Sequence, residues 1–95
     1  MSTVAPPRTE AEAVTYGWQV FRAAQMTEWP LEHSVEIYRA FTRLSTELEM
    51  HGRLSDEWAA LAAPRSRARH AEKALGYAAD LVGLLEKYCT KGAAR

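Results

Sequence analysis

The sequence predicts an all-α fold, a small antiparallel helical bundle with three long helices and one short helix. Apolar residues recur at helical spacing along the long segments, and no segment alternates apolar and polar residues as a half-exposed strand would. Residues that favour helix starts and stops separate these segments. With 95 residues, of which 47% are hydrophobic and 25% charged, the chain has the composition of one globular domain.

The first predicted helix begins at Thr9 and ends near Met26. Thr9 and Glu12 match a capping box, in which each side chain accepts a hydrogen bond from the other residue's backbone amide. Gly17 falls in the middle of the apolar face, where a glycine costs about 1 kcal/mol of helix propensity relative to alanine. We therefore expect a neighbouring helix to approach closely at Gly17.

The second predicted helix spans residues 31–51 and follows Pro30, which is tolerated at a helix start. Gly52 is expected to end it in the C′ position. Because the connection from the first helix is short, these two helices should pack antiparallel. The expected apolar side of the second helix consists of Val35, Ile37, Tyr38, Phe41, Leu44 and Leu48.

Ser55 is expected to cap a short third helix, with Leu61 and Trp58 as core contacts, which ends at Pro64. The fourth helix is predicted over residues 65–90 and is the longest. The predicted domain organisation follows from these elements. It comprises a disordered lead-in over residues 1–8, a single helical bundle over 9–90 and a frayed tail over 91–95.

The apolar side of the fourth helix is unusually wide. Its apolar residues spread over roughly 180–200° of the helical circumference, whereas a surface helix needs a stripe of little more than 100°. One flank of that side consists of Tyr77, Leu81, Leu84 and Tyr88. Either this helix lies centrally and contacts other helices on both flanks, or this flank is an interface for a dimer or another protein. The sequence leaves both interpretations open.

A cluster of basic residues surrounds the start of the same helix. Arg65, Arg69 and Lys73 share a stripe that lies almost opposite the apolar side. The solvent-exposed face of any helix in a soluble protein would lie there too. Arg67 falls on the apolar side but lies in the first turn, where it can extend to water. Together with Arg53, these residues are the candidate contacts for nucleic-acid phosphates. The equal numbers of basic and acidic side chains, 12 of each, argue against bulk electrostatic binding.

The sequence offers no pattern for catalysis, a metal or a cofactor. It has no glycine-rich phosphate loop, no G-x-S-x-G and no H-E-x-x-H. Glu47 and His51 are spaced as a surface pair on one helix, and His70 lies on another helix. The single cysteine, Cys89, excludes an intramolecular disulfide and is expected to be a buried small hydrophobe. We therefore expect no enzyme activity, no metal and no cofactor.

These observations predict a small non-catalytic helical protein that acts through protein–protein interaction and self-associates as a homodimer. The alternative is a nucleic-acid-binding regulator that uses the basic stripe. The first residues lack the pattern of a signal peptide, and no apolar run is long enough to span a membrane. We therefore expect a cytoplasmic protein whose partner is itself or another protein.

Overall fold

The structure is a computed structural model that describes residues 9–56, 61 and 63–89. The chain forms α1 (Glu10–Gln25), a short 3₁₀ helix η1 (Leu31–His33), α2 (Ser34–Arg53) and α4 (Pro64–Tyr88). The described residues contain no strand, and the three long helices pack together. The predicted all-α bundle is confirmed.

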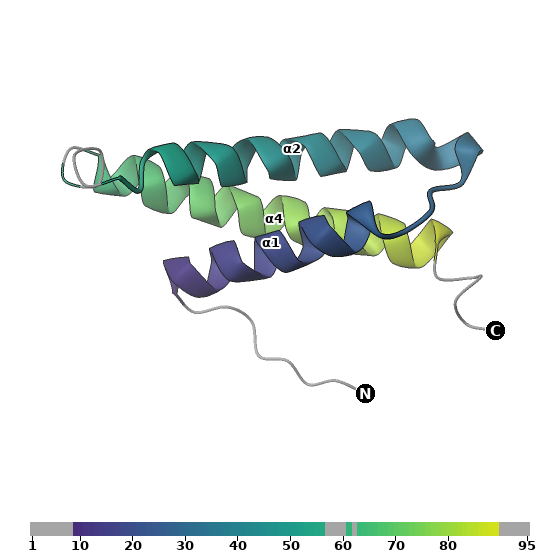
Figure 1. Cartoon of the computed structure of the whole chain (residues 1–95), viewed down its shortest axis with the longest axis horizontal. Coiled ribbons are helices and arrows are strands. Elements are labelled where there is room, and N and C mark those ends of the chain that lie inside the picture. The colour runs from purple at the N-terminus through teal and green to yellow at the C-terminus, as the bar shows by residue number, and fades with distance from the viewer. Residues whose placement is uncertain (1–8, 57–60, 62, 90–95) are drawn as a thin grey trace.

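The three long helices run in alternating directions, so that α2 is antiparallel to both α1 and α4 (Figure 1). Helix α4 contacts both of the others, and α1 and α2 contact each other less than either contacts α4. The arrangement therefore agrees with the first interpretation of the wide apolar side of α4, in which this helix lies centrally and contacts other helices on both flanks.

The start of α1 is held by the predicted capping box. The Glu12 amide donates to Thr9 Oγ1 at 3.1 Å, and the Thr9 amide donates to Glu12 Oε1 at 3.1 Å. These two bonds satisfy amide groups that a helix start leaves without intrahelical partners. The helix then continues to Gln25, one residue short of the predicted end.

The predicted end of the second helix is wrong. Gly52 lies inside α2, which continues to Arg53, and no glycine in the described part of the chain has a positive φ. Glycine permits the left-handed conformation but does not require it. Here the last turn is closed by the Leu54 amide, which donates to the Met50 carbonyl at 3.1 Å, so the helix has no left-handed cap at Gly52.

Two predictions concern the segment between α2 and α4. The short third helix falls largely on residues 57–60 and 62, which lie outside the described residues, as does its expected core contact Trp58. The other expected contact, Leu61, is 81% exposed and does not belong to the core. The last helix begins at Pro64, where the missing amide of proline would have no intrahelical partner.

The core is made mostly of small side chains. Within residues 9–56, 61 and 63–89, four large side chains are fully buried: Ile37, Leu44, Leu48 and Leu81. Alanines supply most of the remaining buried positions, including Ala71, Ala74 and Ala78 on α4. Because an alanine projects little beyond its backbone, α1 and α2 can both pack close to α4.

Gly17 is a packing glycine, as the sequence predicted. It is buried on α1, and a Cβ atom added there would lie 2.9 Å from Leu48 Cδ2 and 3.5 Å from Leu44 Cδ1. Both leucines are fully buried on α2. The absence of a side chain at residue 17 therefore sets how closely α1 approaches α2.

We predict that Gly17→Ala lowers the free energy of unfolding, although alanine is the better helix former. The helix-propensity gain of about 1 kcal/mol is outweighed by overpacking against Leu48, which typically costs about 1–3 kcal/mol. The control is Gly76→Ala on α4, where an added Cβ meets nothing within 4 Å. This variant should gain about 0.5–1 kcal/mol. Chemical denaturation measures both, and an equal gain in the two variants would contradict the packing at Gly17.

Candidate functional site

The flank that the sequence offered as an interface packs against α2 and η1 and keeps only part of its surface exposed. Leu81 is 0% exposed and belongs to the central core. Tyr77, Leu84 and Tyr88 are partly buried and pack against that core. Tyr88 also stacks on His33 of η1, with the ring centroids 3.7 Å apart. Leu81 is therefore a core residue and not part of an exposed surface, because α2 and η1 cover this side of α4.

Three of the exposed large apolar side chains among the described residues lie close together in sequence, at η1 and the start of α2. Leu31 is 89% exposed, Val35 66% and Tyr38 57%. Val35 and Tyr38 are three residues apart and share one side of α2, and Leu31 precedes them on η1. We call these three residues the α2 stripe. The prediction that Val35 and Tyr38 lie on the buried side of this helix is wrong. The buried side centres on Ile37, Ala40, Leu44 and Leu48.

An aromatic cluster lies beside the α2 stripe and joins α1 to α2. Phe21 of α1 stacks on Phe41 of α2, with ring centroids 4.6 Å apart. Trp18 meets the edge of Phe21 at 5.6 Å, and Trp29 from the connecting loop meets Phe41 at 5.3 Å. The Trp29 indole also donates to the Ala24 carbonyl at 3.1 Å. Phe41 lies one turn after Tyr38 on α2, so this cluster is adjacent to the α2 stripe.

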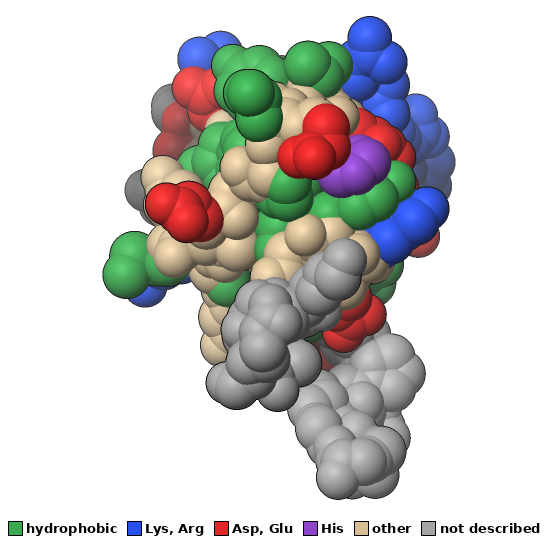
Figure 2. All heavy atoms as spheres, turned by 90° about the vertical axis from the view of Figure 1, so that its right-hand side faces the viewer, with side chains coloured by type: hydrophobic (Ala, Val, Ile, Leu, Met, Phe, Trp, Pro, Cys, Tyr) green, Lys and Arg blue, Asp and Glu red, His purple; other side chains and the backbone are tan. Residues whose placement is uncertain are grey.

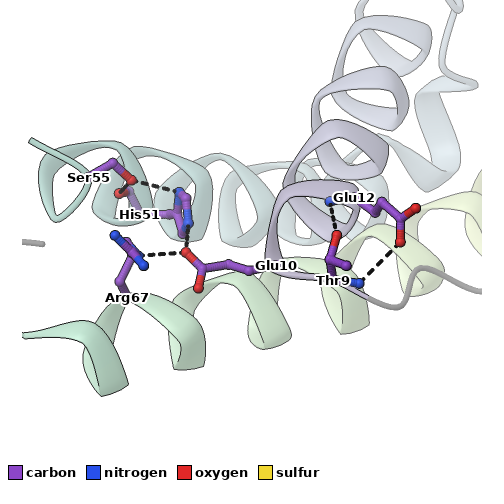
Figure 3. A network of polar contacts seen from close by, with 6 residues as sticks. All are labelled: Thr9, Glu10, Glu12, His51, Ser55 and Arg67. Carbon is purple, nitrogen blue, oxygen red and sulfur yellow. Dashed lines mark hydrogen bonds and ion pairs between the residues drawn. The ribbon is translucent and has the colours of Figure 1, made fainter.

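At the opposite end of the bundle, a polar network connects all three long helices (Figure 3). Glu10 Oε2 of α1 accepts from His51 Nε2 of α2 at 2.7 Å and lies 2.6 Å from Arg67 Nε of α4. Ser55 donates to the His51 carbonyl at 2.7 Å. The hydrogen bond from His51 lowers the pKa of Glu10, and the Arg67 charge acts in the same direction, against the effect of burial. Arg67, predicted to extend to water, instead pairs with Glu10.

The second histidine–glutamate contact also differs from the sequence prediction. Glu47 pairs with His70 of α4, with 2.6 Å between Glu47 Oε1 and His70 Nδ1, and not with His51 on its own helix. Both side chains are mostly buried at the α2–α4 contact. Among the residues that the structure describes, no group of three or more His, Cys, Asp or Glu side chains could hold a metal ion. The histidines therefore act as links between helices.

Two of the five candidate nucleic-acid residues have acidic partners. Arg67 pairs with Glu10, and Arg53 lies 3.4 Å from Glu49 on its own helix. Arg65, Arg69 and Lys73 are exposed along α4. These three alone carry the nucleic-acid alternative, which stays a prediction.

Two grooves flank α4. An apolar groove of about 370 Å³ between α1 and α4 is lined by Val20, Val82 and Leu85 among others. Cys89 borders this groove, and burial raises the pKa of its thiol, which keeps it protonated and weakly nucleophilic. The other groove, between α2 and α4, has basic residues on both walls. Figure 2 views the molecule from the end that carries the α1–α2 connection, and Lys and Arg side chains gather along one edge.

Comparison of the chain with protein-family models, curated proteins and solved structures finds no match. None of the helices in the described part of the chain is long and apolar enough to cross a membrane. A functional proposal must therefore be built from the surfaces of this chain itself.

We predict that Glu10→Gln lowers the free energy of unfolding at pH 7 by about 1 kcal/mol, the typical net value of such a hydrogen bond. The folded-state pKa of Glu10 lies below the ordinary value of 4.5. Its stabilising contribution is therefore complete above that value and is lost as the pH falls through the folded-state pKa. Urea titrations at pH 7 and pH 3 should show that the difference from the unmodified protein is smaller in acid.

The matched control is Glu49→Gln, which breaks the exposed contact with Arg53 on the same helix. An exposed pair of this kind contributes only a few tenths of a kcal/mol. Equal losses in the two variants would show that the three-helix network adds nothing beyond an ordinary surface pair.

Proposed function

We propose that this chain is a non-catalytic interaction protein that self-associates through the α2 stripe. The observation that carries the proposal is the exposure of Leu31 on η1 and of Val35 and Tyr38 on α2, the helix whose other side forms the core. Large apolar side chains that gather on a soluble surface are typical of interaction sites. The homodimer predicted from the sequence is retained, but its interface moves from α4 to α2.

A second copy of the chain suits this stripe because the stripe is self-complementary. In a two-fold dimer, each interface residue faces its counterpart across one shared axis. If two copies of α2 cross antiparallel at Val35, Leu31 of one copy comes opposite Tyr38 of the other. Leu31 lies four residues before Val35, and Tyr38 lies three residues after it. Each end of the contact therefore holds one aliphatic and one aromatic side chain.

The surroundings of the stripe resemble an interface core with a rim. A stable interface buries about 800 Å² per partner, with apolar residues at its centre and polar residues around them. Trp18 is partly exposed at the edge of the neighbouring aromatic cluster and enlarges the apolar centre. Glu32 is exposed nearby and supplies a polar border.

We predict that Val35→Cys forms a disulfide-linked homodimer in a Cys89→Ser background under mild oxidation. Two copies of residue 35 meet at the two-fold axis, where their Cβ atoms come within disulfide reach. The control is Glu36→Cys in the same background, because residue 36 is also exposed but borders the groove toward α4. Non-reducing gel electrophoresis separates the products. Equal cross-linking at both positions, or none at position 35, would contradict this dimer.

A second pair of variants separates the interface from the core. Val35→Glu should give a helical monomer in sedimentation and circular dichroism, because the charge blocks association without entering the core. Leu81→Glu should lose helicity, because it places a carboxylate at a position with no solvent exposure. An unmodified protein that sediments as a monomer at micromolar concentration would contradict self-association.

A further inference from the structure

The groove between α2 and α4 combines cationic, acidic and apolar walls. It has a volume of about 560 Å³, within the range of small-molecule sites. Arg39 and Arg43 lie on the α2 wall, and Lys87 lies on the α4 wall. Tyr77 and Leu84 supply apolar surface. None of these basic residues was among the nucleic-acid candidates identified in the sequence.

The two arginines of this groove are available to a ligand. They are four residues apart, so they lie one turn apart, about 6 Å along the helix axis, on the same wall. Among the described residues, no ion pair joins Arg39, Arg43 or Lys87 to a carboxylate, although Arg53 and Arg67 are both paired. The planar guanidinium group matches phosphate oxygens in a two-pronged hydrogen bond. Two such groups on one wall, with Lys87 opposite, suit a phosphate.

Glu36 and Asp80 also line the groove and limit what it can accept. They lower its formal charge from three positive to one positive, which disfavours binding driven by charge alone. Ionised carboxylates accept hydrogen bonds from hydroxyl groups but donate none. A ligand that carries hydroxyl groups beside its phosphate can therefore use both kinds of side chain.

We propose that the α2–α4 groove binds a phosphate ester of a sugar, with its phosphate on Arg39 and Arg43 and its hydroxyl groups toward Glu36 and Asp80. Two sources supply this chemistry: a free nucleotide or sugar phosphate, and a single-stranded nucleic acid. The proposal rests on a different surface from the α2 stripe, so failure of either leaves the other unaffected.

The test is calorimetric titration of the full chain at 50 mM salt with three probes: inorganic phosphate, adenosine monophosphate and a short single-stranded RNA oligonucleotide, whose 2′-hydroxyl groups lie beside its phosphates. Adenosine monophosphate should bind more tightly than inorganic phosphate, because only the nucleotide carries sugar hydroxyl groups. Arg39→Ala with Arg43→Ala should weaken binding about tenfold or more, as expected when two charge-assisted hydrogen-bonding groups are lost. Binding of the oligonucleotide alone, with the same loss, would identify nucleic acid as the source.

The control is Arg22→Ala, compared with Arg43→Ala alone; Arg22→Ala removes the same charge from an exposed position outside the groove lining. It should change affinity by no more than about twofold, the effect of a small change in net charge. Arg39→Lys with Arg43→Lys keeps the charge but loses the planar group, and decides the question if the alanine variant does not fold. Equal weakening in groove and control variants, no weakening in the lysine variant, or no binding of any probe would overturn the proposal.

Discussion

Helix α4 is packed on two flanks at once, and the rest of the structure depends on that double contact. Its buried alanines, Ala71, Ala74 and Ala78, let α1 and α2 come close to its backbone from different directions. Leu81 is fully buried in the central core. This arrangement buries most of the wide apolar side of α4 inside the chain. Leu31, Val35 and Tyr38, on η1 and the start of α2, stay exposed.

The α1–α2 contact is the weaker one, and different interactions hold its two ends. Near the connecting loop, Phe21 stacks on Phe41, and Trp29 makes an edge contact with Phe41. At the far end, Glu10 binds His51 and Arg67 together. Aromatic packing contributes through buried area and tolerates small shifts, whereas a hydrogen-bonded ion pair requires a particular register. The polar network therefore fixes the alignment of three helices whose small-residue core would tolerate sliding.

Local features of the sequence predicted most of the fold. The capping box at Thr9 and the helix start at Pro64 could be predicted because they are local sequence signals. The close approach at Gly17 could be predicted because periodicity places this glycine on the apolar face, where it lowers helix propensity. The contacts of the candidate site could be predicted less well from the sequence. Spacing allowed Glu47 to pair with His51, but the packing of α2 on α4 brings His70 closer. Periodicity likewise shows that Val35 and Tyr38 are apolar, but not whether another helix lies beside them.

The central claim is that self-association uses the α2 stripe and not the apolar flank of α4. Hydroxyl-radical footprinting of the intact chain at increasing protein concentration tests it most directly. At low concentration, Leu31, Val35 and Tyr38 should be modified readily and Leu81 should be protected. At high concentration, the three α2 residues should become protected, while the modification of Tyr77, Leu84 and Tyr88 stays unchanged. Protection that develops on the α4 residues instead, with α2 still reactive, would contradict the account.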